Sequence, residues 1–115
     1  MILLCPIVKP TIRRGATNGT SVIENKPTNL PCPAYGNPPP DITWFKDGRR
    51  LTGNEIGVTL NADGSLSLAS ARPEDAGIYR CEATNPAGRG VHIIELEIFR
   101  KFAQCRRLLS LHMNP

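Results

Sequence analysis

The sequence has little that would support a membrane span or a reaction. No apolar run among its 115 residues approaches the roughly 20 residues that a membrane-spanning helix needs. Its two histidines, His92 and His112, stand in no metal-binding or catalytic motif, and the chain has neither a nucleophile elbow nor a phosphate-binding loop. The four cysteines include no C-x-x-C pair, which argues against a zinc site. These absences predict a non-catalytic protein without a metal or cofactor.

The positive charge is confined to one end of the chain. The formal net charge is +4, yet the residues up to Ile98 include ten basic and ten acidic side chains. The excess therefore consists of Arg100, Lys101, Arg106 and Arg107. A nucleic-acid-binding domain would carry positive charge on its folded part. A neutral body with a basic tail predicts no nucleic-acid partner.

What the sequence does contain is a pair of cysteines in a distinctive setting. Cys32 and Cys81 are 49 positions apart, with Trp44 12 positions after the first and Tyr79 two positions before the second. Side chains on one face of a strand recur at every second position, so Tyr79 and Cys81 share a face. Four cysteines in a small β-domain also favour an oxidising compartment. This pattern is typical of two packed sheets with a bridge across the middle.

Longer stretches around these residues resemble one family. The sequence is similar to immunoglobulin domains of the intermediate set (I-set), and most similar to the tandem modules of hemicentin-type extracellular matrix proteins. Titin-like muscle domains and neural adhesion receptors share most of the same signature. The matching stretches are residues 30–40 (LPCPAYGNPPP), 42–48 (ITWFKDG), 64–68 (GSLSL) and 75–88 (DAGIYRCEATNPAG).

The resemblance implies an all-β, immunoglobulin-like sandwich of two sheets with Greek-key connections. A central disulfide between Cys32 and Cys81 would join the sheets. Trp44, Tyr79 and Leu68 would pack around this bridge as the core. In the chain-entropy model, a bridge that closes a loop of about 50 residues contributes on the order of 4 kcal/mol. It would therefore be the most important single feature for stability.

The same resemblance implies a structured corner before the last pair of strands. Asp75 would accept hydrogen bonds from backbone groups of the turn, and Gly77 belongs to the same corner. The hydroxyl group of Tyr79 would bond back to the backbone upstream, as a tyrosine corner. None of these residues would have a catalytic role.

We expect the domain to span residues 9–98. Residues 1–8 would lie outside it, and residues 99–115 would form a basic tail that is disordered or a short helix. Pro31 and Pro33 cannot donate to a sheet ladder, so the strand expected at residues 28–35 should be irregular. The other expected strands are residues 20–24, 41–46, 49–51, 55–60, 65–69 and 90–98.

The last expected strand contains a break in its alternation. Its apolar residues Val91, Ile94, Leu96 and Ile98 are taken as the inward set. This set requires a slip near His92, which predicts a β-bulge.

Several surface features are left open by the sequence. Asn18 begins the N-glycosylation sequon Asn-Gly-Thr, which makes it a candidate glycosylation site if the chain is secreted, and the alternative is a polar turn without sugar. The pairs Arg13-Arg14 and Arg49-Arg50 could provide a basic surface for a sulfated glycan. The exposed edge strands at 20–24 and 90–98 and the loops 36–40 and 85–88 are the expected contact surfaces.

Cys5 and Cys105 are not expected to form a second bridge. In such a sandwich the first strand begins at one end and the last strand finishes at the other, whereas a disulfide needs Cα atoms within about 7 Å. Both thiols would be free or paired outside this chain.

The resemblance implies a module of a larger extracellular or cell-surface protein. Its partners would be other immunoglobulin modules, of the same or a different protein, or matrix components, and its work would be adhesion or matrix architecture. One alternative is a receptor module that binds a ligand or sulfated glycan through basic residues. A second alternative is an intracellular elastic module of the muscle type, with its cysteines reduced.

Overall fold

The computed structural model describes residues 8–12 and 19–100, which form β-strands and one 3-10 turn. The strands are β1 (Val8–Ile12), β2 (Gly19–Ile23), β3 (Thr28–Leu30), β4 (Ala34–Asn37), β5 (Asp41–Lys46), β6 (Arg49–Arg50), β7 (Val58–Leu60), β8 (Leu66–Leu68), β9 (Gly77–Asn85) and β10 (Gly88–Phe99), and the 3-10 turn η1 spans Pro73–Asp75. No helix in these ranges is long and apolar enough to cross a membrane.

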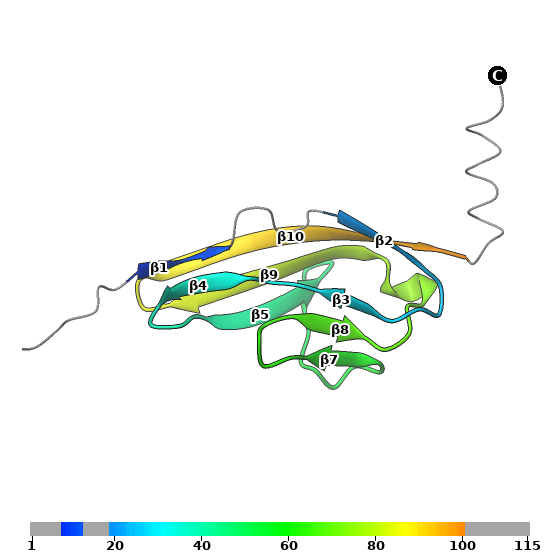
Figure 1. The fold of residues 1–115 in the computed structure, drawn as a ribbon, viewed down its shortest axis with the longest axis horizontal. Coiled ribbons are helices and arrows are strands. Elements are labelled where there is room, and N and C mark those ends of the chain that lie inside the picture. The colour runs from blue at the N-terminus through cyan, green and yellow to red at the C-terminus, as the bar shows by residue number, and fades with distance from the viewer. Residues whose placement is uncertain (1–7, 13–18, 101–115) are drawn as a thin grey trace, which may run out of the picture.

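The strands form two packed layers. One sheet has the order β2-β10-β9-β5-β6, and the other contains β3-β8-β7 and, at one end, the pair β1-β4 (Figure 1). All pairings are antiparallel except that of β2 with β10, which is parallel. Strand β1 begins at one end of the molecule, and β10 finishes at the other (Figure 1). The all-β, two-sheet sandwich predicted from the sequence is confirmed.

Alternating apolar residues of both sheets fill the space between the layers. This alternation is clear in β9, where every second residue from Tyr79 to Ala83 is buried. Trp44 is 1% exposed, and the side chains of β8 close the opposite wall. The buried cluster consists of Leu30, Cys32, Trp44, Leu51, Leu66, Leu68, Tyr79, Cys81, Ile94 and Leu96.

The strand expected at residues 28–35 is interrupted, as its prolines predicted. Residues 31–33 form no ladder, and they separate β3, which pairs with β8, from β4, which pairs with β1. The break has a physical cause, because Pro31 and Pro33 carry no N–H group to donate. One continuous segment thereby serves two different neighbours, and Cys32 lies at the break.

Strand β10 corrects the expectation of a bulge. Its register with β9 runs without a shift from Gly88 to Leu96, and Val91 is 43% exposed instead of inward. The inward position beside it holds Gly90, because β1 crosses there: a Cβ atom on Gly90 would lie 2.8 Å from the carbonyl oxygen of Pro10. The strand therefore alternates regularly, with Gly90 at the inward position next to β1, and the expected inward placement of Val91 is wrong.

The expected exposure of the last strand as an edge also needs correction. From Glu95 to Phe99, β10 pairs with β2, and it still pairs with β9 at Glu95 and Leu96, so β2 forms the border of this part of the sheet. The strand expected at 55–60 is shortened to β7, because Glu55 belongs to a turn. Its carboxylate accepts hydrogen bonds from the N–H groups of Thr52 and Gly53 at 3.0 Å and 2.9 Å.

Candidate interaction face

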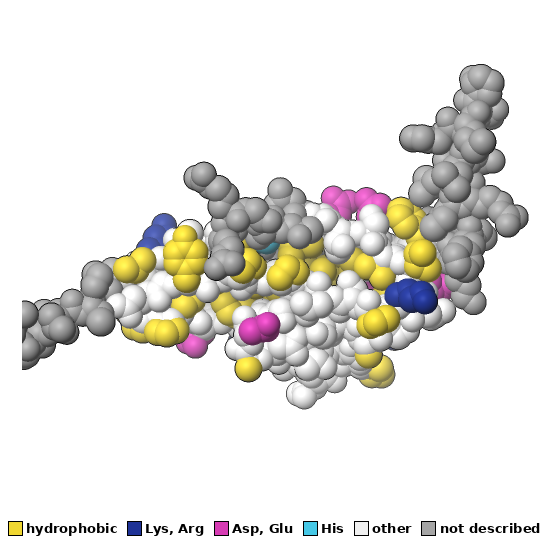
Figure 2. Space-filling view, viewed as in Figure 1, with side chains coloured by type: hydrophobic (Ala, Val, Ile, Leu, Met, Phe, Trp, Pro, Cys, Tyr) yellow, Lys and Arg dark blue, Asp and Glu magenta, His cyan; other side chains and the backbone are white. Residues whose placement is uncertain are grey.

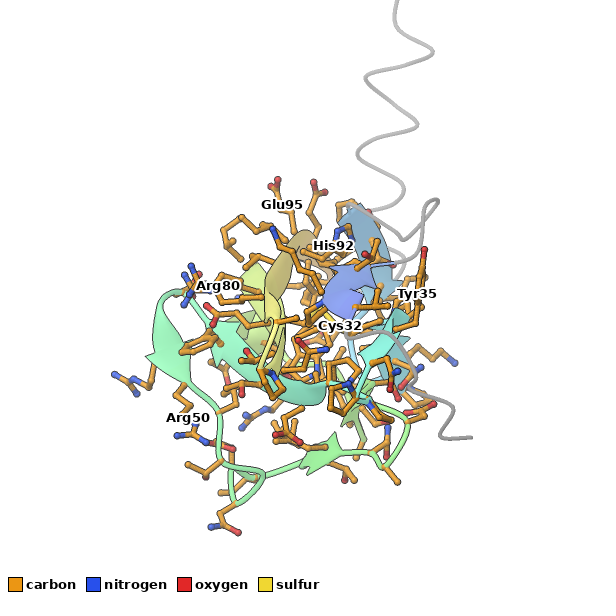
Figure 3. All side chains as sticks on the ribbon, turned by 90° about the vertical axis from the view of Figure 1, so that its left-hand side faces the viewer. Cys32, Tyr35, Arg50, Arg80, His92 and Glu95 are labelled. Carbon is orange, nitrogen blue, oxygen red and sulfur yellow. A yellow bond between two sulfur atoms is a disulfide. The ribbon has the colours of Figure 1, made fainter. Side chains whose placement is uncertain are left out.

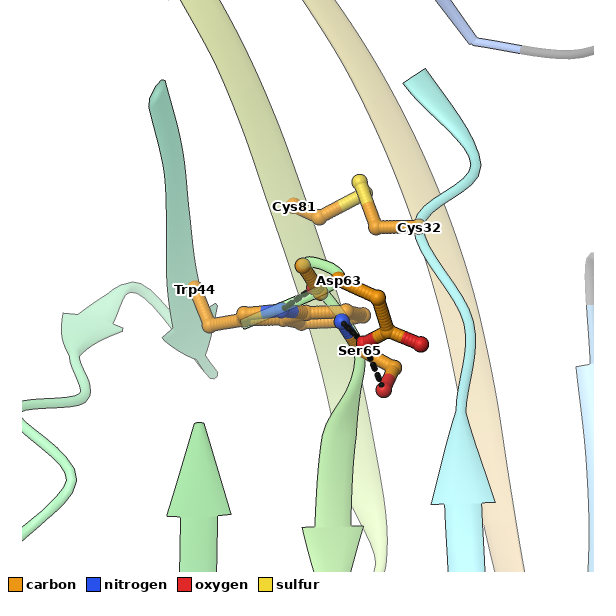
Figure 4. The surroundings of a disulfide bond; sticks show 6 residues. Cys32, Trp44, Asp63, Ser65 and Cys81 are labelled. Atoms are coloured by element: carbon orange, nitrogen blue, oxygen red, sulfur yellow. Dashed lines mark hydrogen bonds between the residues drawn. A yellow bond between two sulfur atoms is a disulfide. The ribbon is translucent and has the colours of Figure 1, made fainter. Parts of the chain in front are cut away.

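The centre of the sandwich is the disulfide between Cys32 and Cys81. The two Cα atoms are 6.4 Å apart, and both residues are buried. Cys32 comes from the break between β3 and β4, whereas Cys81 is in the middle of β9, so the bond joins the two sheets (Figure 4). The predicted inter-sheet disulfide is confirmed.

Trp44 lies flat beside this bond (Figure 4). Its indole Nε1–H donates to the carbonyl oxygen of Gly64 at 2.8 Å, which satisfies the polar atom of a buried ring. The turn that presents this carbonyl is held by Asp63. Its carboxylate accepts from the backbone N–H and the hydroxyl of Ser65 at 2.9 Å and 2.6 Å, and these bonds lower the pKa of Asp63.

Asp75 and Tyr79 meet at the corner after η1. The Tyr79 hydroxyl donates to the Asp75 carbonyl oxygen at 2.6 Å. The Asp75 carboxylate accepts from the Arg72 N–H at 2.9 Å and lies 3.5 Å from the Arg72 guanidinium. Burial, followed by the charges of Asp75 and Asp47, raises the pKa of Tyr79, so the phenol stays protonated. The corner is a structural device in which every polar group named has a partner.

Gly77 makes room for a second carboxylate at this corner. A Cβ atom there would lie 2.7 Å from Oδ2 of Asp47, and its φ of +151° disfavours other residues. The Asp47 carboxylate accepts from the N–H of Ile78 at 2.9 Å, and this bond is the main cause of its lowered pKa. Gly77 therefore allows the β5–β6 hairpin to be tied to the start of β9.

The opposite end of the sandwich is tied together by Asn85. Its side-chain amide donates to the carbonyl oxygens of Val8 at 2.7 Å and Pro38 at 3.0 Å. The same side chain accepts from the N–H of Ala87 at 2.9 Å. One residue thus joins the β9–β10 turn, the first strand and the proline-rich loop.

The side of β5, β9 and β10 that points away from the disulfide forms an outer face. Cross-strand neighbours place Phe45 beside Arg80 and Arg80 beside Ile93. Arg80 and Glu95 point outward, while Cys32 lies inside (Figure 3). The outward residues of these three strands include Thr43, Phe45, Ile78, Arg80, Glu82, Arg89, Val91, Ile93, Glu95 and Glu97.

A network of charges is fixed on this outer face. The Arg80 guanidinium lies 4.2 Å from the centre of the Phe45 ring, a cation–π contact. Its Nε lies 3.1 Å from Glu82, at ion-pair distance but without hydrogen-bond geometry. Glu82 also pairs with Arg89 at 3.5 Å. The planar guanidinium is therefore held against the sheet, with one carboxylate between two arginines.

The other predicted site residues lie beside this network, in the core or outside the described residues. Arg49 and Arg50 are exposed, and Arg50 is the cross-strand neighbour of Phe45. Leu68 is buried in the core. The positions that lie outside the described residues are Cys5, Arg13, Arg14, Asn18 and Cys105.

Sequence reasoning does not single out Arg80, Glu82 and Ile93, which lie at the centre of the outer face. Arg80 and Glu82 alternate with the inward set of β9, and Ile93 precedes a buried neighbour. Strict alternation along β9 and β10 was the signal that could have found them. No group of three potential metal ligands occurs among residues 8–12 and 19–100.

Comparison with known proteins agrees with this architecture. An immunoglobulin-domain family model matches residues 9–85. Human hemicentin-1 is 40% identical over 96 residues, covering 80% of this chain and 2% of hemicentin-1. The chain spans about 2% of the length of the hemicentins it matches.

Two solved structures illustrate the likeness of architecture. The structure of Sidekick-1 immunoglobulin domains 1–4 has a TM-score of 0.77 at 25% identity, covering 82% of this chain and 25% of that one. The complex of titin M10 with the obscurin-like 1 immunoglobulin domain has a TM-score of 0.74 at 31% identity, covering 81% and 96%. A two-sheet sandwich with a central bridge defines an immunoglobulin-like fold. The chain belongs to the immunoglobulin-domain family and resembles hemicentin modules.

Proposed function

We propose that this chain is a non-catalytic binding module of a larger extracellular or cell-surface protein. It would serve adhesion or matrix architecture through contacts with other proteins. The observation that carries the proposal is the Cys32–Cys81 bridge within a domain similar to hemicentin modules. Disulfides form and persist in oxidising compartments, such as the secretory pathway and the extracellular space. Relatives of the domain include extracellular and cell-surface proteins.

Another immunoglobulin domain is the kind of partner we favour. Titin M10 was crystallised in complex with an obscurin-like 1 immunoglobulin domain, so one such domain can bind another. The outer face of β5, β9 and β10 exposes isoleucine and valine beside charges of both signs. A mixed apolar and charged surface of this kind is suited to binding another protein.

The proposal is tested by producing the chain through a secretory host. Intact mass before and after reduction, followed by peptide mapping, should show a Cys32–Cys81 link. The same mapping shows whether Asn18 carries sugar, which we propose for the secreted chain. Folded, secreted protein with four free thiols would contradict the extracellular assignment.

The intracellular elastic module stays the alternative, because the titin M10 complex shares the fold at 31% identity. It predicts a domain that folds equally well with Cys32 and Cys81 reduced. Thermal unfolding of protein purified under reducing conditions separates the two proposals, since the extracellular module should lose much of its stability without the bridge.

A further inference from the structure

The outward side chains of β10 form a row with a different character at each end. The row reads Arg89, Val91, Ile93, Glu95 and Glu97, all of them exposed. It is cationic at the β9–β10 turn, apolar in the middle and acidic at the end of the strand. Ile93, which is 54% exposed, is the midpoint. At about 3.3 Å per residue, each end lies roughly 13 Å from it.

We propose that this outer face binds the same face of a second copy, with the two β10 strands running antiparallel about Ile93. The inference deepens the proposed function, on which it rests, by naming the partner. A twofold axis at Ile93 places Arg89 of each copy opposite Glu97 of the other and brings the two Ile93 side chains together. Arg89 and Glu97 are equally distant from Ile93, so a single operation forms both of these ion pairs, and it places Glu95 opposite Val91.

The acidic end is shaped to receive a cation. Glu95 and Glu97 lie two positions apart on the same side of the strand, so their charges repel one another. Figure 2 shows acidic side chains standing together over the border formed by β10 and β2. A shallow, largely open hollow lies beside them, lined by Ile78, Glu95, Glu97 and Phe99 among others. A guanidinium from a second copy would relieve the repulsion and enter this hollow.

At the centre of the face, the contacts of Arg80 reduce the charge repulsion between two copies. Arg80 is the cross-strand neighbour of Ile93, so the twofold axis brings two Arg80 side chains near each other. Their repulsion is reduced because Arg80 lies against the Phe45 ring and pairs with Glu82. The arginine is held flat before binding, which lowers the entropy lost at the interface.

The mixture of charges favours a protein over a sulfated glycan at this face. Glu82 neutralises part of the charge of Arg80 and Arg89, and the acidic end would repel a polyanion. A copy of the chain supplies both signs at the spacing required.

Sedimentation velocity on the full chain tests this inference, with loading concentrations from about 1 µM to about 1 mM. We expect a reversible dimer that weakens as salt is added. Ile93→Arg should weaken it by roughly a hundredfold, since it buries charge at the centre. Arg89→Glu and Glu97→Arg should each weaken it by roughly tenfold. Nonreducing electrophoresis separates any covalent dimer through Cys5 or Cys105.

Mixing the two charge variants gives the sharpest readout. An R89E chain and an E97R chain repel themselves, but each offers the charges that the other lacks. Their mixture should therefore restore association to near the original level, and so should the double variant R89E/E97R. Ile56→Arg is the matched control, because Ile56 is 83% exposed and lies outside β5, β9 and β10. Circular dichroism confirms that each variant is folded.

Three results would overturn the inference. They are a chain that stays monomeric at about 1 mM and low salt, a dimer that Ile93→Arg leaves intact, or a mixture of the charge variants that fails to associate. Heparin binding that is lost on Arg80→Ala, without any self-association, would assign the face to a glycan. None of these results touches the mass measurement on secreted protein, so the proposed function fails or stands separately.

Discussion

The interior of the sandwich and the outer face of β5, β9 and β10 lie on two sides of the same strands but differ in burial and in charge. Ile93 is 54% exposed and Ile94 is fully buried, although they are adjacent in sequence. Inside, apolar side chains surround one disulfide; outside, isoleucine and valine stand between fixed charges. The comparison teaches that one strand can stabilise the domain with alternate residues and offer the remaining ones to a partner.

Removing the disulfide should affect the interior most. Cys32→Ala combined with Cys81→Ala opens a loop of about 50 residues and should lower the free energy of unfolding by about 4 kcal/mol. Urea titration followed by tryptophan fluorescence measures the change, since Trp44 lies beside the bond. A loss below about 1 kcal/mol would mean that the packing alone carries the fold, as an intracellular module requires.

The neighbours Ile93 and Ile94 test the comparison directly. Ile94→Ala should cost about 3 kcal/mol, because it leaves a cavity between the sheets. Ile93→Ala removes the same atoms from the outer face and should stay within about 0.5 kcal/mol. Urea titrations of both variants give the two values. Equal losses would show that the face is part of the core and not a free surface.

Much of the interior could be predicted from the sequence, and little of the face. Cys32, Trp44 and Cys81 stand at the spacing typical of an immunoglobulin sandwich, so the sequence and its resemblance to that family predict the bridge. The hydrophobic effect buries apolar residues in any fold, so residue type predicts the core. The contacts of an exposed charge depend instead on which residues lie beside it. Arg80 depends on Phe45, which is 35 positions away, and this juxtaposition becomes visible only when the strand register is known.

Strand β10 shows why even a strong apolar pattern can mislead. Val91 looks inward by residue type, but the inward place is taken by Gly90, which leaves space for the backbone of Pro10. The sequence around Val91 does not indicate that β1 crosses β10 at this point. The sequence therefore predicted the strand and misplaced its face near the turn.

Gly77→Ala should disturb the corner that joins the two regions. The new Cβ atom would lie 2.7 Å from the Asp47 carboxylate, at a φ of +151°. We expect a loss of about 2 kcal/mol in the free energy of unfolding, from backbone strain and the displaced carboxylate. Gly48→Ala is the control, because Gly48 also has a positive φ but no atom within 4 Å of the added carbon. Equal losses in the two variants would show that strain alone is responsible.

Tyr79→Phe should have a smaller effect than the loss of the bridge. It removes the hydroxyl group that donates to the Asp75 carbonyl at 2.6 Å but keeps the buried ring. The expected cost is about 1 to 2 kcal/mol, since a buried carbonyl loses its partner. Thermal unfolding should show a lower midpoint with unchanged cooperativity, and an unchanged midpoint would mean that water replaces the hydroxyl.

The smallest effect should be the pH dependence contributed by Asp47, at the border between interior and face. The hydrogen bond from the Ile78 N–H lowers its pKa in the folded chain, so the folded state favours the charged carboxylate. Its contribution is present above the unfolded pKa of about 3.9 and is lost as the pH falls through the lower folded value.

Asp47→Asn should therefore reduce the loss of stability between neutral and acidic pH, while Glu55 and Asp63, whose pKa values are also lowered, keep part of it. Urea titrations of both chains at about pH 6 and about pH 2.5 measure the difference. Identical losses would show that the Asp47 bond forms equally well with a protonated carboxyl group. A loss confined to the original chain would place the acid sensitivity of the domain at the junction between its stable interior and its outer face.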